Sequence, residues 1–317
     1  KRAIEIYGAD ATRMTLLLAA EDLDDPDWRD KNAREAMSML ETILKICEQV
    51  ASIEEAEESE ADAWLLSTLQ RRIERITSNM EVLKTRTAAS EAIYGLYNDW
   101  KWYLRRNGGR IGRAARIFME TWIKLLAPFI PFTAEEAWSI LGKSGFVSLE
   151  RWPEPDKRLI NEVVELREEI LTRLMEDVRS IIEVYRRNPR RVIIYLAAPS
   201  KIRMLEKALE ILDAKPHNPV GELIRWIMSE RIIEAKKAPN MARLIFDLIS
   251  AYSSRYAREA ILEVAKSEKT FYERARDFLE RELGALVEIY EEGAEGIYDP
   301  RGKALSALPL RPGIYVE

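Results

Sequence analysis

Residues 85–106 read TRTAASEAIYGLYNDWKWYLRR, and this stretch decides how the first half of the chain folds. Its pattern predicts a helix over 87–106 that ends at the turn Asn107-Gly108-Gly109, with a further helix over 111–127. An aromatic-rich helix therefore runs directly into a basic turn, and the two helices form a hairpin.

Charge is distributed unevenly around this hairpin. Between Trp100 and Met119 the sequence has no carboxylate and six cations, namely Lys101, Arg105, Arg106, Arg110, Arg113 and Arg116. The whole chain has a formal net charge of -5. A purely basic segment in an acidic protein indicates a polyanionic partner, and Trp102 and Tyr103 could offer ring faces to ribose or base. The alternative is a solvated basic face whose aromatic rings point into the core.

Two further amphipathic helices are predicted before the hairpin, over 31–51 and 62–80. Together the four helices form an antiparallel bundle. A run of acidic residues between the first two is expected to be a solvated connection; it comprises Glu54, Glu55, Glu57, Glu58, Glu60 and Asp62. After the bundle, Thr133 and Glu136 have the spacing of a capping box for a short helix. The segment Trp152-Pro153-Glu154-Pro155 marks the expected end of the first domain.

The second half of the chain changes character. One long helix is expected from Ile160 to about Arg187, and the β-branched run at 191–198 predicts a strand. Further strands are expected at 285–290 and 313–316, and the helices between are predicted over 201–213, 219–229, 241–253, 256–266 and 270–283. The predicted fold is therefore mainly α, with an antiparallel helical bundle followed by a small α/β domain.

Composition excludes several kinds of chemistry. The single thiol, Cys47, and the single imidazole, His217, exclude a disulfide framework and a Cys/His zinc site and leave scant room for a catalytic triad. Cys47 is expected to be a buried apolar residue, and His217 to lie in a loop. No long apolar stretch or signal-peptide core is present, so we expect a cytoplasmic protein and no membrane partner.

Ordered motifs over about 150 residues resemble one family. The segment Tyr7-Gly-Ala-Asp-Ala-Thr-Arg13 resembles the G-A-D-x-x-R helix that follows the K-M-S-K-S loop of class I aminoacyl-tRNA synthetases. Further motifs follow in family order: Asp27-Trp28-Arg29, Arg86-Thr-Ala88, Tyr94, Asn98-Asp99, Trp102-Tyr-Leu-Arg-Arg106, Leu126-Ala-Pro-Phe-Ile-Pro131, Glu135-Glu136-x-Trp138, Val147-Ser148 and Trp152-Pro153. With the ending Pro309-Leu-Arg-Pro-Gly-Ile-Tyr-Val-Glu317, the chain is similar to the carboxyl-terminal portion of archaeal-type leucyl-tRNA synthetases, which belong to class Ia.

This resemblance implies a division into three parts. Residues 1–30 would be the stem-contact region, 31–155 an anticodon-binding helical bundle, and 156–317 a carboxyl-terminal tRNA-binding domain. The H-I-G-H and K-M-S-K-S signatures of the catalytic core do not occur here. The resemblance therefore implies a chain that is inactive alone and needs no cofactor, while ATP and Mg serve the full-length enzyme.

The same resemblance implies the partners and the binding residues. The chain would bind tRNA-Leu as a monomer and work with the amino-terminal catalytic core of the same enzyme. In the archaeal type the last residues help to recognise the long variable arm, which carries over to Ile314, Tyr315, Val316 and Glu317. With the six cations and Trp102, these are the expected tRNA-binding residues. The alternative for the tail is an edge strand that only closes the sheet.

Two other interpretations stay open from the sequence alone. The motif Leu126-Ala-Pro-Phe-Ile-Pro131 is shared with isoleucyl-, valyl- and methionyl-tRNA synthetases, although the Arg86-Thr-Ala88 region and the tail favour leucine. A helical protein-interaction scaffold is the interpretation from a different class, and failure of the chain to bind RNA would favour it.

Overall fold

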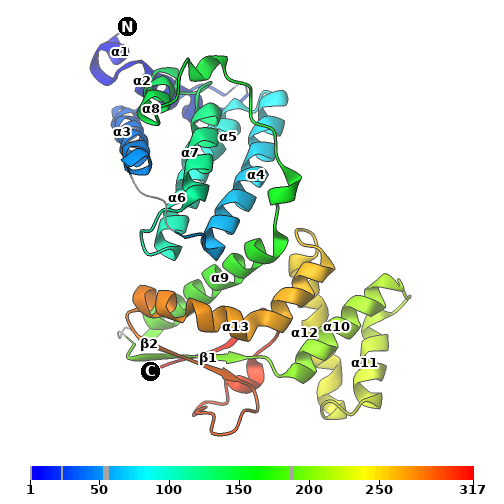
Figure 1. Ribbon diagram of the computed structural model, residues 1–317. Helices are drawn as coiled ribbons and strands as arrows, with labels where there is room; N and C mark the ends of the chain where they lie inside the picture. Colours follow the sequence, from blue (N-terminus) through cyan, green and yellow to red (C-terminus); the bar gives the residue numbers. More distant parts are fainter. Residues whose placement is uncertain (1, 23, 53–56, 186–188) are drawn as a thin grey trace. The chain divides into compact units, whose positions relative to one another are not determined.

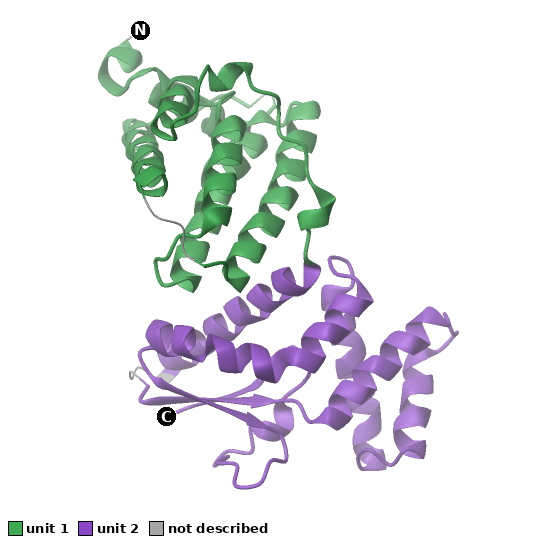
Figure 2. Cartoon of the chain, in the orientation of Figure 1, with its two compact units in different colours: residues 1–161 green, residues 162–317 purple. Residues whose placement is uncertain are grey.

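The structure is a computed structural model that describes residues 2–22, 24–52, 57–185 and 189–317. The chain divides into two compact units, Lys1–Asn161 and Glu162–Glu317 (Figure 2). It is mainly helical, and a three-stranded sheet lies in the second unit (Figure 1). The predicted fold class is confirmed.

The first unit is a helical bundle. Its described elements are α1 (Arg2–Tyr7), α2 (Ala9–Ala19), α3 (Asp30–Ser52), α4 (Glu60–Glu81), α5 (Thr85–Ser90), η1 (Glu91–Gly95), α6 (Leu96–Arg106), α7 (Arg113–Leu126), α8 (Pro131–Ile140), η2 (Val147–Leu149) and η3 (Lys157–Leu159). The helix α4 packs against α6 and α7, and α3 packs against α7 and α8 (Figure 1). The consecutive helices α5, η1 and α6 form one continuous rod over Thr85–Arg106, which contains the helix predicted over 87–106.

Large aromatic side chains fill the core of this bundle. Trp100 and Phe118 stack with their ring centroids 6.0 Å apart, and Trp122 follows at 5.7 Å from Phe118. All three are fully buried, and burial of such rings contributes a large share of the hydrophobic free energy. The indole N–H of Trp122 donates to the carbonyl of Ala92 at 2.7 Å. Cys47 lies in the same core, as predicted, and burial raises the pKa of its thiol to about 12.

A π-helical segment, η1, interrupts the α-helical hydrogen bonding inside this rod. Next to it, Arg72 of α4 binds Asp99 of α6 through two hydrogen bonds of 2.7 and 2.9 Å, and it also pairs with Glu91. A Cβ on Gly95 would lie 2.9 Å from the guanidinium of Arg72. The absence of a side chain at Gly95 therefore lets α4 and the rod approach closely around a mostly buried ion cluster.

The second unit places helices against a small mixed sheet. Its described elements are α9 (Glu162–Tyr185), β1 (Arg191–Leu196), α10 (Pro199–Asp213), α11 (Pro219–Ser229), η4 (Ala235–Lys237), α12 (Ala238–Tyr252), α13 (Arg258–Leu283), β2 (Leu286–Glu291), η5 (Ala304–Ser306) and β3 (Gly313–Val316). The strand order is β2-β1-β3, with β1 parallel to β2 and antiparallel to β3. Helix α13 contacts β2 and α9 contacts β3, so these two helices cover one face of the sheet (Figure 1).

Three details of the predicted elements are wrong. A single helix, α13, replaces the two helices predicted over 256–266 and 270–283, because neither Gly nor Pro interrupts it. The capping box is also absent: α8 begins at Pro131 before Thr133, and the backbone N–H of Thr133 donates to the carboxylate of Asp10 at 2.6 Å instead. Third, Asp62 is buried in α4 and does not belong to a solvated connection; Glu54 and Glu55 lie outside the described residues.

Candidate nucleic-acid interface

Glycine conformations shape the turn between α6 and α7. Gly108 and Gly109 have φ of 62° and 80°, a left-handed backbone that glycine adopts at low cost. Gly112 stands directly before α7, and a Cβ added there would lie 2.5 Å from Oδ1 of Asp62. The turn can therefore approach the start of α4 only because residue 112 has no side chain.

Tyr103 fixes this turn to α4. Its ring is fully buried, so the prediction that it could face RNA is wrong. The hydroxyl donates to Oδ1 of Asp62 at 2.8 Å and accepts the backbone N–H of Gly112 at 2.8 Å. Burial, together with the neighbouring carboxylate of Asp62, raises the pKa of Tyr103 to about 12. Asp62 also completes a capping box with Ser59 at the start of α4, so one buried polar cluster joins three segments.

The predicted cations lie on both sides of this fixed turn. Five of them are exposed and Arg106 is half-buried; the exposed cations are Lys101, Arg105, Arg110, Arg113 and Arg116. We use the name basic hairpin for the six cations and Trp102. Among the described residues, Lys101, Arg110 and Arg113 form no ion pair with a carboxylate. Their positive charge is therefore not neutralised within the unit.

The two helix ends at this turn act on the potential of the basic hairpin in opposite ways. Arg105 and Arg106 lie in the last turn of α6, where cations complement the negative end of the helix dipole. Arg113 and Arg116 lie at the start of α7, where the dipole is also positive. The second placement opposes helix stability, but it adds to the positive potential that an anion would meet at this turn.

Trp102 is half-buried at the side of the basic hairpin. The guanidinium of Arg105 lies 5.4 Å from the centre of its ring, within the range of a cation–π interaction. One helical turn earlier, the ammonium of Lys101 lies 4.7 Å from the ring centre of Tyr97. These rings hold the long cationic side chains in position over the helix surface.

The four predicted tail residues form or follow the edge strand β3. Ile314, Tyr315 and Val316 are half-buried and Glu317 is exposed. Glu317 exchanges backbone hydrogen bonds with Arg191 of β1 at 2.9 and 3.1 Å, and its carboxylate pairs with the Arg191 guanidinium at 2.5 Å. Because bonded and non-bonded pairs alternate along an antiparallel ladder, the backbone groups of Ile314 and Val316 point away from β1. The outer edge of β3 therefore presents these groups.

A group of tyrosines beside the tail was not anticipated from the sequence. Tyr315 contacts Tyr298 with ring centroids 6.3 Å apart, and Tyr195 stacks on Tyr290 at 6.4 Å. The hydroxyl of Tyr195 donates to the carbonyl of Tyr298 at 2.6 Å, and the guanidinium of Arg191 lies 4.5 Å from the Tyr298 ring. The register of β1 and β2 places Tyr195 opposite Tyr290, and Tyr298 comes from the segment between β2 and β3, so spacing along the chain gives no signal for the cluster.

The basic hairpin belongs to the first unit and the tail to the second. In the described ranges, no cluster of three or more His, Cys, Asp or Glu side chains could hold a metal ion. The same ranges contain no helix long and apolar enough to cross a membrane. His217 lies exposed in a bend between α10 and α11, as predicted.

The chain matches a family model described as the anticodon-binding domain of tRNA ligase, over residues 62–194. It is 36% identical over 324 residues to the leucine–tRNA ligase of Pyrococcus abyssi, a match that covers 99% of this chain and 31% of that protein. The leucine–tRNA ligase of Methanothrix thermoacetophila is 34% identical over 323 residues, covering 100% of this chain and 33% of that protein. The chain thus spans about a third of the length of these curated relatives.

One solved structure is also similar, a crystal structure of the ternary complex of Agrobacterium radiobacter K84 agnB2 LeuRS, tRNA and LeuAMS. It is 20% identical with a TM-score of 0.44, and the match covers 62% of this chain and 22% of that one. The sequence relatives carry the assignment, and the leucine enzymes among them confirm the resemblance predicted from the motifs. The chain belongs to the leucine–tRNA ligase family and corresponds to the carboxyl-terminal portion of such a ligase, with an anticodon-binding domain.

Proposed function

We propose that this chain binds tRNA-Leu and positions it for leucylation by the catalytic core of leucine–tRNA ligase. The observation that carries the proposal is the basic hairpin, whose turn is fixed to α4 by the buried contacts among Tyr103, Asp62 and Gly112. A fixed array of cations on an anticodon-binding domain suits a phosphate backbone better than it suits a flexible or neutral partner.

The physical role of the basic hairpin is orientation. Contacts from Lys and Arg to phosphates release counterions and hold the RNA in one register, but they carry no sequence information. Orientation of the RNA matters because the acceptor end of the tRNA must reach a distant reaction centre. The effective molarity of that end at the reaction centre depends on how firmly the RNA is positioned. In this proposal Trp102, already covered on one side by Arg105, offers its remaining surface to ribose or base.

Specificity for tRNA-Leu is assigned in this proposal to the tail, through the long variable arm. The outward backbone groups of Ile314 and Val316 can donate and accept hydrogen bonds without any particular base. Tyr315 adds a half-buried ring beside this edge, and the exposed Glu317 holds the end of the tail against β1 through its ion pair with Arg191. Such an edge suits recognition of the shape of an RNA arm, which is how proteins often select structured RNA.

The remaining assignments follow the family. We propose that residues 1–30 contact the tRNA stem and join the catalytic core, that 31–155 act as the anticodon-type bundle, and that 156–317 form the carboxyl-terminal tRNA-binding domain. ATP, Mg and leucine would be handled by the catalytic core, so the chain by itself would not leucylate tRNA. Its partners would be tRNA-Leu and that core, and it would bind them as a single copy.

Filter binding tests this function with three RNAs: a tRNA-Leu transcript, the same transcript without its variable arm, and tRNA-Ser. We expect the chain to bind tRNA-Leu most tightly and to lose affinity when the arm is removed. Equal and weak binding to all three RNAs would contradict the proposal and would favour the protein-interaction scaffold.

A charge-reversal variant tests the basic hairpin itself. The double substitution of Arg105→Glu and Arg106→Glu should weaken tRNA binding and flatten its salt dependence, by about 0.7 to 0.9 in the log-log slope for each phosphate that the protein no longer neutralises. The matched control reverses two exposed cations on α3, Arg34→Glu and Lys45→Glu, which gives the same change in net charge. If the two double variants had equal slopes, the basic hairpin would not be an RNA surface.

A further inference from the structure

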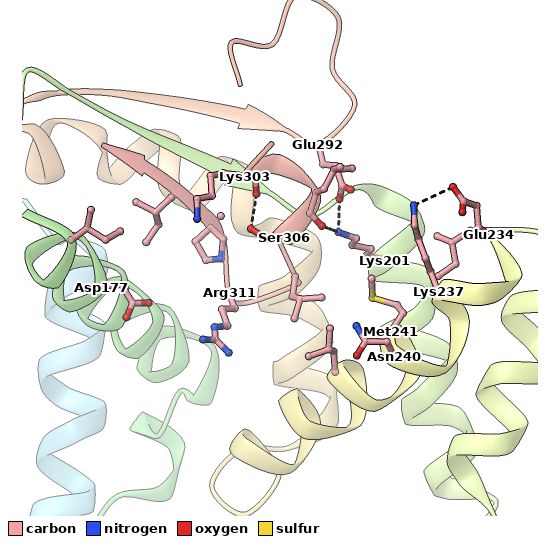
Figure 3. Close-up of a pocket in the computed structure, with 18 of the residues that line it drawn as sticks. Asp177, Lys201, Glu234, Lys237, Asn240, Met241, Glu292, Lys303, Ser306 and Arg311 are labelled. Carbon is pink, nitrogen blue, oxygen red and sulfur yellow. Dashed lines mark hydrogen bonds and ion pairs between the residues drawn. The ribbon is translucent and has the colours of Figure 1, made fainter. Parts of the chain in front are cut away.

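A large open cavity lies in the second unit (Figure 3). Of the residues proposed above to bind tRNA, only Ile314 lines it among the described residues. Its walls come from α9, from α12, and from the segment that runs through η5 to β3. Its volume is about 970 Å³, at the upper end of the range for small-molecule sites. A cavity of this size can hold a ligand of several rings or groups.

A buried lysine, Lys201, forms part of one wall of the cavity. Lys201 is 4% exposed, and its ammonium donates to the carbonyls of Leu305 and Ala307 at 2.9 and 2.7 Å and pairs with Glu292 at 2.9 Å (Figure 3). These contacts satisfy all three donors of the ammonium. Lys201 and Glu292 therefore fix the shape of the cavity wall and leave ligand recognition to other side chains.

Three exposed cations line the cavity from three different segments: Lys237, Lys303 and Arg311. Lys237 pairs with Glu234 at 3.1 Å, whereas the side chains of Lys303 and Arg311 have no partner among the described residues (Figure 3). Arg can bind a phosphate with two parallel hydrogen bonds, and Lys can add a point charge. The cavity therefore has uncommitted cationic groups suited to a phosphate.

The other walls do not suit a bare anion. Apolar side chains of Ile181, Met241 and Leu244 line the cavity, and the carboxylate of Asp177 has no partner among the described residues. Asn240 adds an amide that can both donate and accept. Apolar walls can cover the face of a flat ring, Asp177 can accept hydrogen bonds from the edge of a base, and Asn240 offers a polar group on the opposite side of the cavity (Figure 3).

We propose that this cavity binds a nucleoside phosphate, with its phosphate at Arg311 and Lys303 and its base against the apolar side chains, with the edge of the base at Asp177. The same chemistry is found in a free mononucleotide and in an unstacked nucleotide of bound RNA. If the ligand is a nucleotide of bound RNA, the inference rests on the proposed tRNA function and adds a second binding site to it. If the ligand is a free mononucleotide, the inference is independent of that function.

Equilibrium dialysis of the full chain tests the site with the four nucleoside monophosphates, the four nucleosides and inorganic phosphate. We expect at least one monophosphate to bind about tenfold or more tightly than its nucleoside or than phosphate, because two sets of contacts act together. If inorganic phosphate bound as tightly as every monophosphate, or if no monophosphate bound, the proposal would be overturned.

Two variants separate the roles of the walls. The double variant with Arg311→Gln and Lys303→Gln should weaken binding of every monophosphate about tenfold or more, because it removes hydrogen bonds from charged groups to the phosphate. Arg243→Gln removes an exposed cation of α12 that does not line the cavity, and it should change nothing. Asp177→Asn should alter the preference among the four bases, which a purely structural role would not do. An unaltered order of preference would remove the base-edge assignment.

Competition with tRNA-Leu identifies the source of the ligand. If the monophosphate and tRNA-Leu displace each other, and the Arg311 and Lys303 variant weakens both, the cavity takes an RNA nucleotide. If the monophosphate binds without displacing tRNA-Leu, the cavity takes a free nucleotide. Failure of the basic hairpin variant to affect RNA binding would contradict the proposed function but would leave this nucleotide-binding result unchanged.

Discussion

Glu268 is 3% exposed in α13, and its carboxylate accepts a hydrogen bond from the backbone N–H of Leu310. One of its oxygens has no hydrogen-bond partner, and the buried hydroxyl of Tyr272, one helical turn away, has none either. Leu310 has a left-handed backbone with φ of 61°, which is costly for a branched residue. A buried acid therefore stabilises a strained turn that leads directly into β3.

This burial predicts a pH dependence of stability that Glu268→Gln should remove. Burial raises the pKa of Glu268 from 4.5 to about 8, so the free energy of unfolding should be fully retained below pH 4.5 and should fall between 4.5 and 8. Gln keeps an acceptor for Leu310 without the charge. Above pH 8 the variant should therefore be more stable than the wild type, by at most about 5 kcal/mol.

Urea unfolding at pH 5, 7 and 8.5 measures this effect. Glu263→Gln, an exposed carboxylate in the same helix, is the matched control and should leave the dependence on pH unchanged. A constant difference in stability between the Glu268 variant and the wild type over this range would contradict the assignment.

At the scale of single residues, the sequence predicts burial better than it predicts polar partners. Cys47 was expected in the core and lies there, because helical spacing with its apolar neighbours is a local property. Tyr103 and Asp62 were misplaced because their hydrogen bond joins residues 41 positions apart, and the geometry depends on a glycine at 112. Such contacts depend on tertiary packing, which periodicity does not contain.

At the scale of elements, carboxylates from α2 and from the segment after it bind the starts of two later helices of the first unit. Asp10 of α2 accepts the backbone N–H of Thr133 in α8, and Glu21 accepts the N–H groups of Arg86 and Thr87 at the start of α5. Each carboxylate satisfies donors that a helix leaves without intrahelical partners. These contacts join the segment that follows α1 to two later helices of the bundle.

The cap on α8 predicts different outcomes for two substitutions. Asp10→Ala should lower the free energy of unfolding by about 1 to 2 kcal/mol, because it leaves a helix end uncapped in a buried position. Glu136→Ala, which would be equally costly if a capping box with Thr133 existed, should have little effect. Urea unfolding of the two variants measures the difference. A larger loss of unfolding free energy for Glu136→Ala would indicate that the capping box exists.

The predicted elements agree with the structure where the signal is local. The sequence predicts the turn after α6 from its two glycines and the strand that begins at Arg191 from its β-branched residues, and the structure confirms both. The π-helical segment η1 was not predicted, since it depends on packing of Trp122 and Arg72 from other helices. The strand register that pairs Tyr195 with Tyr290 depends likewise on pairing between distant segments.

At the scale of the whole molecule, the proposed function divides between the two units. In the proposal, the basic hairpin would supply charge, which acts on any RNA and is screened by salt. The tail would supply a shaped edge with few charges, and it would contact only an RNA that has a long variable arm. Effects on the logarithm of affinity should therefore add when variants of the two parts are combined.

This division predicts separable defects in tRNA binding. Replacing Arg105 and Arg106 by Glu should weaken tRNA-Leu and the arm-deleted transcript by the same factor and flatten both salt slopes. Tyr315→Ala should weaken tRNA-Leu alone, toward the affinity of the arm-deleted transcript, with an unchanged slope. Leu286→Ala, at an exposed position on β2 of the same sheet, is the control for damage to the strands. Filter binding at several salt concentrations measures all three, and equal weakening of both RNAs by Tyr315→Ala would mean that the tail does not read the arm.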